Sequence, residues 1–227
     1  MRIEGIDSKR TPEKGGLAQL IERVLINKIF IDFVKEGAKV VAQEGIEVGF
    51  ICIVLKDGSI RFSHLKRGGL TSMKEDFALE RIIKPIDKEK DVEMVEYEIA
   101  RRLMKGEPLD DFIDFELNFH FHPADPKDDP CSILPSYEDL IVLNNIVPTI
   151  LGIGTVGEDK KRKRGKISLI FFKAKKRLLR EDIGLCCTLI EESTSVKEFL
   201  EKIKGDEYLR NYLEIIYLED KFTVNLK

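Results

Sequence analysis

The segment Glu116–His122 constrains the fold of this chain most, because polar and apolar residues alternate along its whole length and a proline ends it. This period of two is typical of a half-buried β-strand. Successive side chains of a strand point to opposite faces, so we expect His120 and His122 on one face, with the intervening phenylalanines packed behind them. Two imidazoles one strand step apart can bind the same metal ion.

A candidate third ligand follows a polar loop at residues 123–135. Ser136 then begins an apolar-periodic stretch that predicts a helix, with Asp139 in its first turn. If the loop folds this turn back over the strand, Asp139 completes a three-ligand site, which keeps one coordination position open for water. The same Ser-x-x-Asp pattern is also typical of a helix N-cap, in which the Ser136 oxygen accepts from helix amides and Asp139 favours the positive helix end.

These residues resemble the motif of the JAMM/MPN (JAB-type) zinc metalloproteases, a deubiquitinase-like family of isopeptidases. The shared pattern is His-x-His-Pro, a loop, Pro-Ser-x-x-Asp, then a helix and an apolar strand, and the similarity covers about residues 29–178. The resemblance implies a single α/β (strictly α+β) domain with a curved mixed sheet flanked by helices. It also implies a Zn²⁺ ion held by His120, His122 and Asp139.

The family presents its catalytic glutamate between a helix and an apolar strand that leads into a hairpin. Here Phe30–Gln43 predicts the helix, and Phe50–Leu55 predicts the strand, which ends in a Lys-Asp-Gly turn. Glu47 immediately precedes the strand and is the glutamate that the resemblance implies, with Glu44 as the alternative. The ordinary structural interpretation of either residue is a solvated acid at a helix-to-strand junction.

The resemblance implies a mechanism that follows from zinc chemistry. A catalytic zinc ion lowers the pKa of its bound water from near 15.7 to about 7. Glu47 would take the proton and return it to the leaving amine, and Ser136 would hydrogen-bond the developing oxyanion, a contact worth ~3 kcal/mol in the transition state. The implied substrates are protein conjugates of ubiquitin-like modifiers, and no cysteine nucleophile is needed.

The chain departs from the family pattern in two places. Phe121 stands between the histidines, where the family usually has Ser or Thr, and the loop from His122 to Ser136 holds thirteen residues, several more than usual. The longer loop brings rival ligands, of which the thiolate of Cys131 is the strongest because zinc binds sulfur readily. The other rivals are Asp125, Asp128 and Asp129. Two histidines and a carboxylate would also suit iron or manganese.

Length and composition agree with this interpretation without adding to it. A chain of 227 residues with 43% hydrophobic content can bury a sizeable core. We find no apolar run long enough to span a bilayer and no signal-peptide pattern, so we expect a cytoplasmic protein without a membrane partner. The four cysteines form no metal-knuckle or redox motif, so we expect reduced thiols.

We divide the chain into a flexible tail (1–16), a JAMM/MPN-like domain with an extra N-terminal helix (17–180) and a helical C-terminal extension (181–227). In the extension, a capping box at Ser195 predicts one helix, and Tyr208–Leu218 predicts another. The extra N-terminal helix and the C-terminal extension could cover an apolar face, form a homodimer contact or steer a substrate. The sequence does not distinguish among these roles.

Two other patterns favour neither nucleotide nor nucleic acid as a partner. Gly152–Gly157 matches the letters of a dinucleotide fingerprint, but no helix is predicted to begin within it. The basic cluster Lys160–Lys166 lacks interleaved aromatic residues, so a solvated hairpin loop is preferred. Two alternative functions stay open: a noncatalytic MPN-like scaffold, and a protein that resembles the bacterial RadC-like proteins linked to DNA metabolism.

Overall fold

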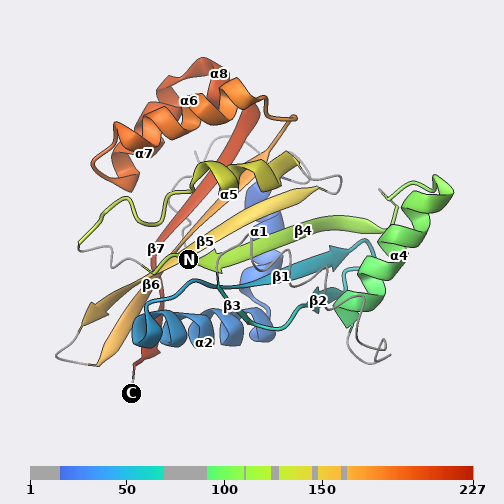
Figure 1. Ribbon diagram of the computed structural model, residues 1–227, viewed down its shortest axis with the longest axis horizontal. Coiled ribbons are helices and arrows are strands. Elements are labelled where there is room, and N and C mark those ends of the chain that lie inside the picture. The colour runs from blue at the N-terminus through green and yellow to red at the C-terminus, as the bar shows by residue number, and fades with distance from the viewer. Residues whose placement is uncertain are drawn as a thin grey trace.

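A computed structural model describes residues 16–68, 91–109, 111–123, 128–144, 148–159 and 163–226. Apart from Gly16, the tail predicted at residues 1–16 lies outside the described residues. The described elements form an α+β fold, as the sequence predicted, with one mixed sheet between layers of helices (Figure 1).

The framework is an open sheet of seven strands in the order β2-β1-β4-β5-β6-β7, with the short β3 also paired to β1. β4 and β5 run parallel to each other, and the other neighbouring strands of the described sheet are antiparallel. The strands are β1 (Val48–Leu55), β2 (Ile60–Phe62), β3 (Lys66–Arg67), β4 (Ile113–Phe121), β5 (Thr149–Asp159), β6 (Arg164–Ala174) and β7 (Leu213–Asn225).

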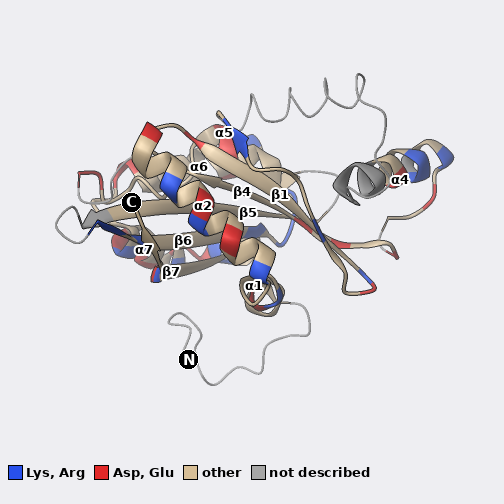
Figure 2. Cartoon of the chain, turned by 90° about the horizontal axis from the view of Figure 1, so that it is seen from below, with Lys and Arg blue, Asp and Glu red and all other residues tan. Residues whose placement is uncertain are grey.

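Helices cover both faces of this sheet. Two N-terminal helices, α1 (Leu17–Leu25) and α2 (Lys28–Glu44), pack on one face (Figures 1 and 2). The helix α4 (Asp91–Lys105) lies at the end of the sheet beside β2. The opposite face carries α5 (Tyr137–Ile141), a 3₁₀ turn (Val142–Asn144), α6 (Arg180–Glu191), α7 (Val196–Gly205) and α8 (Glu207–Tyr212).

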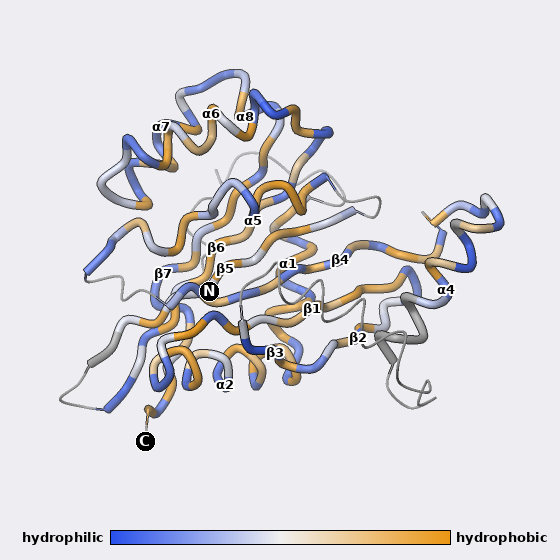
Figure 3. Tube along the Cα trace, viewed as in Figure 1, coloured by the Kyte–Doolittle hydropathy of each residue, from blue (hydrophilic) through white to orange (hydrophobic). Residues whose placement is uncertain are grey.

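The core on the α1–α2 face contains a cluster of phenylalanine rings among aliphatic side chains. Every second residue of β4 from Phe115 to Phe121 is buried there, and the hydropathy of the trace alternates accordingly (Figure 3). The ring of Phe119 lies 5.7 Å from that of Phe30 on α2 and 5.2 Å from that of Phe50 on β1. The strand predicted from period-two alternation is therefore confirmed, with its aromatic face inward.

Most elements predicted upstream of the extension are confirmed. The helices predicted at the N-terminus and at Phe30–Gln43 correspond to α1 and α2. The predicted strand and turn at residues 50–58 form β1 and its hairpin to β2. Within the described chain, no helix is both long and apolar enough to cross a bilayer.

The helix predicted over Tyr208–Leu218 is wrong. α8 ends at Tyr212, and Leu213 begins β7, a thirteen-residue strand at the edge of the sheet. The sequence Leu-Glu-Ile-Ile-Tyr-Leu is apolar at positions that fit both periods, and its β-branched and aromatic residues suit a pleated surface, so pairing with β6 decides its conformation. The C-terminal extension therefore completes the sheet, and it also contains α6, a helix that the sequence analysis missed.

Two glycines of the fingerprint-like motif leave space for neighbouring phenylalanine rings. The whole motif lies in β5, and a Cβ atom at Gly154 would come within 2.5 Å of the Phe121 ring. A Cβ atom at Gly152 would meet Phe119 at 2.7 Å. These residues are small because the β4 phenylalanines occupy the space above them.

We expect Gly154→Ala to lower the free energy of unfolding by about 1–3 kcal/mol, because the added methyl overpacks a fully buried ring. Gly157→Ala on the same strand is the control, since its Cβ atom would find its nearest neighbour at 4.0 Å. We expect the control to change stability by at most about 0.5 kcal/mol. Urea denaturation of both variants measures the difference, and equal stabilities would contradict this packing.

Candidate metal centre

The end of β4 presents both histidines on the face opposite the phenylalanine core. His120 pairs with Gly49 of β1 on one side and with Ile153 of β5 on the other. The backbone N–H of His122 donates to the Gly154 carbonyl at 3.0 Å, so the second histidine is also held at the sheet. His120 is 1% exposed and His122 is partly exposed, so the site opens toward the strand end.

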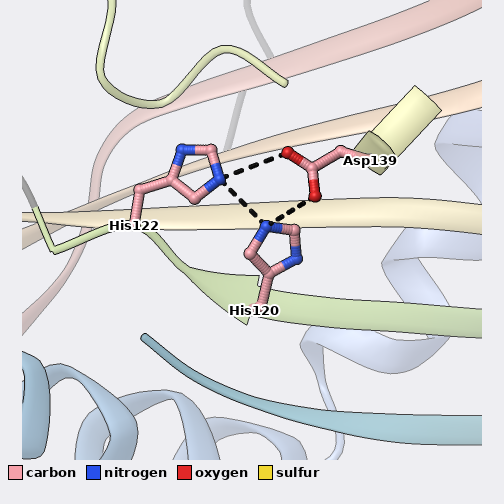
Figure 4. A group of neighbouring side chains, drawn as sticks. All are labelled: His120, His122 and Asp139. Atoms are coloured by element: carbon pink, nitrogen blue, oxygen red, sulfur yellow. Dashed lines mark hydrogen bonds and ion pairs between the residues drawn. The ribbon is translucent and has the colours of Figure 1, made fainter. Parts of the chain in front are cut away.

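Asp139 comes from the other layer and meets the two imidazoles (Figure 4). Its Oδ1 atom lies 3.3 Å from the Nε2 atom of His120, and its Oδ2 atom lies 3.5 Å from the Nε2 atom of His122. The two Nε2 atoms are 2.9 Å apart. These three residues are the group in the described chain that could hold a metal ion, with all ligand atoms within 4.8 Å of one another.

The capping pattern at Ser136 is also present, and it orients the ligand. The Ser136 N–H donates to the Asp139 Oδ2 atom at 2.8 Å, and the Asp139 N–H donates to the Ser136 Oγ atom at 3.2 Å. The sequence suggested two roles for Asp139, as part of a helix N-cap or as a metal ligand. The cap is confirmed, and it is compatible with metal binding, because its reciprocal bonds fix the carboxylate while leaving it directed at the histidines.

The spacing of the donor atoms fits a cation. Donors bound at about 2.0–2.1 Å in a tetrahedral arrangement lie roughly 3.3 Å apart. Here the two Nε2 atoms are 2.9 Å apart, and each lies 3.3 or 3.5 Å from a different oxygen of the Asp139 carboxylate. The Nδ1–H of His122 donates to the Ser132 carbonyl at 2.6 Å. This bond leaves the Nε2 lone pair of His122 available, as in metal sites whose histidines are fixed by a second partner.

The electrostatics of the centre favour neutral His120 beside an ionised carboxylate. Burial lowers the pKa of His120 to about 4, against the opposing charge of Asp139. Burial also disfavours protonation of His122, but its bond to Asp139, the Asp139 charge and the Ser132 carbonyl raise its pKa above the ordinary value. Burial would raise the pKa of Asp139, yet its bond with His122 and the nearby His120 hold it at about 2.

Glu47 lies beside this group, and Glu44 is engaged elsewhere. β1 pairs Val48 with Phe121, so extending the register by one residue places Glu47 opposite His122, on the same face. The charge of Glu47 is one of the causes that raise the pKa of His122. The Glu44 carboxylate instead forms an exposed ion pair with Arg67 at 2.8 Å.

The rival ligands of the long loop are directed away from the centre where they are described. The Cys131 thiol donates to the Ser193 carbonyl at 3.2 Å, and a carboxylate oxygen of Asp129 accepts from the Cys131 N–H at 2.9 Å. Asp128 is exposed, and Asp125 lies outside the described residues. The sequence did not reveal the Ser132 carbonyl as a partner of His122, because a backbone acceptor leaves no mark on residue type.

Comparisons of this chain with protein-family models, with curated proteins and with solved structures each found no match. The likeness to the JAMM/MPN family therefore stays an interpretation of the motif. What the structure adds is geometry: a buried His-His-Asp group with a glutamate beside it.

We expect about one proton to be released per divalent ion bound at about pH 5.5, because His122 is protonated there while His120 and Asp139 are not. Protons compete only at His122 in this range, so metal affinity should fall about tenfold per pH unit as the pH drops below the raised pKa of His122. Calorimetric titration in buffers of different ionisation enthalpy measures the release. Two protons per ion would contradict the assigned charge states.

Proposed function

We propose that this protein is a zinc-dependent isopeptidase or peptidase of the JAMM/MPN type, which cleaves ubiquitin-like modifiers from protein conjugates with a metal-activated water. The observation that carries the proposal is the meeting of His120, His122 and Asp139 from two separate elements, with Glu47 opposite His122. A structural metal site would need no additional acid at this position.

Zinc is the proposed metal. Two imidazoles and one carboxylate match the three-ligand sets of zinc hydrolases, and Zn²⁺ accepts the near-tetrahedral spacing of these donors. When bound, the ion would supply Lewis acidity and make a coordinated water acidic enough to ionise near neutral pH. Iron and manganese are the alternatives that the same donors would accept.

Glu47 is the proposed proton carrier. It follows α2 and precedes β1, and its main-chain carbonyl accepts from the Gly68 N–H at 2.9 Å, which fixes the backbone at this junction. Being only partly buried, the carboxylate can reach water at the site while staying on the His122 face. It would take a proton from the attacking water and donate it to the leaving amine.

Ser136 is the proposed hydrogen-bond donor to the oxyanion. The helix cap uses its oxygen as an acceptor, which leaves the hydroxyl hydrogen able to donate. The residue is exposed at the start of α5, three positions before the ligand Asp139, so a bound carbonyl group could approach it. Loss of one such donor costs about 10²–10³ in rate in other enzymes.

The proposed substrates are conjugates of ubiquitin-like proteins, and the proposed location is the cytoplasm. All four cysteines are free thiols, which agrees with a reducing compartment.

The burial of His120 and Asp139 allows charged groups in the centre to interact strongly, because water screens them poorly there.

We expect Glu47→Gln to bind zinc as tightly as the parent protein and to lose cleavage of a ubiquitin-like fusion by about 10²–10⁴-fold, because proton transfer is removed while the ligands stay. Glu44→Gln is the matched control, since it removes the neighbouring acid from a surface ion pair. Metal content by atomic emission and turnover against a panel of fusions, with and without chelator, measure both effects.

The same panel separates the alternatives. Undiminished turnover in Glu47→Gln would reject the assigned base. Parent protein that binds stoichiometric zinc but cleaves no fusion would favour a noncatalytic scaffold, with His120→Ala as the metal-free reference. Salt-dependent DNA binding at physiological ionic strength, without cleavage of the fusions, would favour the RadC-like alternative.

A further inference from the structure

The two histidines of the centre are held in different ways. His120 is fixed by burial, and among the described residues its Nδ1 atom has no hydrogen-bond partner. His122 is less buried, and its ring depends on the 2.6 Å bond from Nδ1 to the Ser132 carbonyl. The position of that carbonyl therefore sets the direction of the His122 lone pair.

The Ser132 carbonyl belongs to a tight turn at residues 129–134. The Ser132 N–H donates to the Asp129 carbonyl at 3.0 Å, and the Leu134 N–H donates to the Cys131 carbonyl at 2.8 Å. The side chain of Asp129 also accepts from the Cys131 N–H at 2.9 Å. These bonds give the turn a shape, but they do not attach it to the rest of the molecule.

The attachment comes from the C-terminal helices. The Cys131 thiol donates to the Ser193 carbonyl at 3.2 Å, across sixty-two positions of sequence. Ser193 is itself fixed where α6 meets α7, because its N–H donates to the Ile190 carbonyl at 3.0 Å and its hydroxyl to the Leu189 carbonyl at 2.6 Å. After Ser132, the turn continues into Ile133 (3% exposed) and Leu134 (5% exposed), which are buried in an apolar cluster. The same cluster includes residues of α6 and α7: Ile183, Cys186, Val196 and Phe199.

We propose that Cys131 is a positioning residue of the metal centre. By holding the 129–134 turn against the α6–α7 connection, its thiol keeps the Ser132 carbonyl in place, and this carbonyl orients His122 for metal binding. The C-terminal extension thereby supports the site, a role that its sequence alone did not identify. The inference rests on the metal site of the proposed function, but not on its isopeptidase activity.

The size of the effect follows from known outer-shell partners. Removing a group that orients a metal-binding histidine typically weakens metal affinity 10–100-fold. Cys131 acts one bond further away, through the turn, so we expect the lower end of this range. Its contribution can be separated from packing, because valine keeps an apolar and slightly larger side chain at this position while it removes the hydrogen bond.

The experiment compares Cys131→Val, Cys131→Ser and the control Cys187→Val. Cys187 is also partly buried and packs on the same apolar cluster, but it lies on α6, outside the turn. Co²⁺ affinity is measured by competition with a chelator, and the Co²⁺ absorption spectrum reports ligand geometry. In metal-free, ¹⁵N-histidine-labelled protein, the Nδ1–H resonance of His122 reports its bond to Ser132, and urea denaturation reports stability.

We expect Cys131→Val to weaken Co²⁺ binding about tenfold, to alter the absorption spectrum and to speed exchange of the His122 Nδ1–H with solvent. Cys131→Ser, which keeps a donor, should stay within about threefold of the parent, and Cys187→Val should match the parent in all three readouts. The inference is overturned if Cys131→Val leaves the Nδ1–H exchange unchanged, or if both valine variants lower affinity and stability alike.

The readouts also separate this inference from the proposed function. If the parent protein binds no metal, the zinc proposal fails, while the Nδ1–H resonance still tests the Cys131 contact in the metal-free protein. If the parent binds metal but cleaves nothing, the positioning role is judged on Co²⁺ affinity and on the Nδ1–H exchange of His122, neither of which depends on cleavage. An effect of Cys131→Val on cleavage without any effect on affinity would contradict the inference.

Discussion

The two faces of β4 carry different side chains, and this difference determines which layer packs on each face of the sheet. The odd-numbered residues of β4 from Phe115 to Phe121 fill the core against α1 and α2. His120 near the end of the strand, and His122 just beyond it, face the other layer. A shift of the strand by one residue would exchange these faces, placing imidazoles in the core and phenylalanines at the site. The apolar core therefore fixes the register of the two candidate metal ligands.

The second layer completes the centre through local bonds rather than through bulk packing. The reciprocal cap between Ser136 and Asp139 places a carboxylate over the strand, and the Ser132 carbonyl holds His122 from the adjoining loop. A helix as short as α5 would be marginal by itself, so its cap and the buried Leu140 beneath it are what keep the ligand in place. The residues that stabilise this layer therefore also position the candidate ligands.

Sequence reasoning predicted the parts of the site that are encoded in residue type and spacing. Alternation placed His120 and His122 on one face, and the cap pattern located Asp139 at a helix start. It could not supply the Ser132 carbonyl, which is a backbone group, nor the side on which Glu47 lies, which depends on the pairing of β1 with β4. The first six residues of β7, 213–218, were predicted as part of a helix because their apolar positions fit both periods, and only the pairing with β6 settles their conformation.

X-ray absorption spectroscopy at the zinc edge is the most direct test of the His120, His122 and Asp139 centre. It identifies the atoms bound to zinc in the zinc-bound protein and does not depend on activity. We expect a first shell of nitrogen and oxygen atoms at about 2.0–2.1 Å, with the outer-shell scattering of two imidazoles. A sulfur neighbour at about 2.3 Å would show that Cys131 has left Ser193 to bind the metal. That spectrum, or the failure of the protein to retain one zinc ion per chain, would contradict the His120, His122 and Asp139 centre.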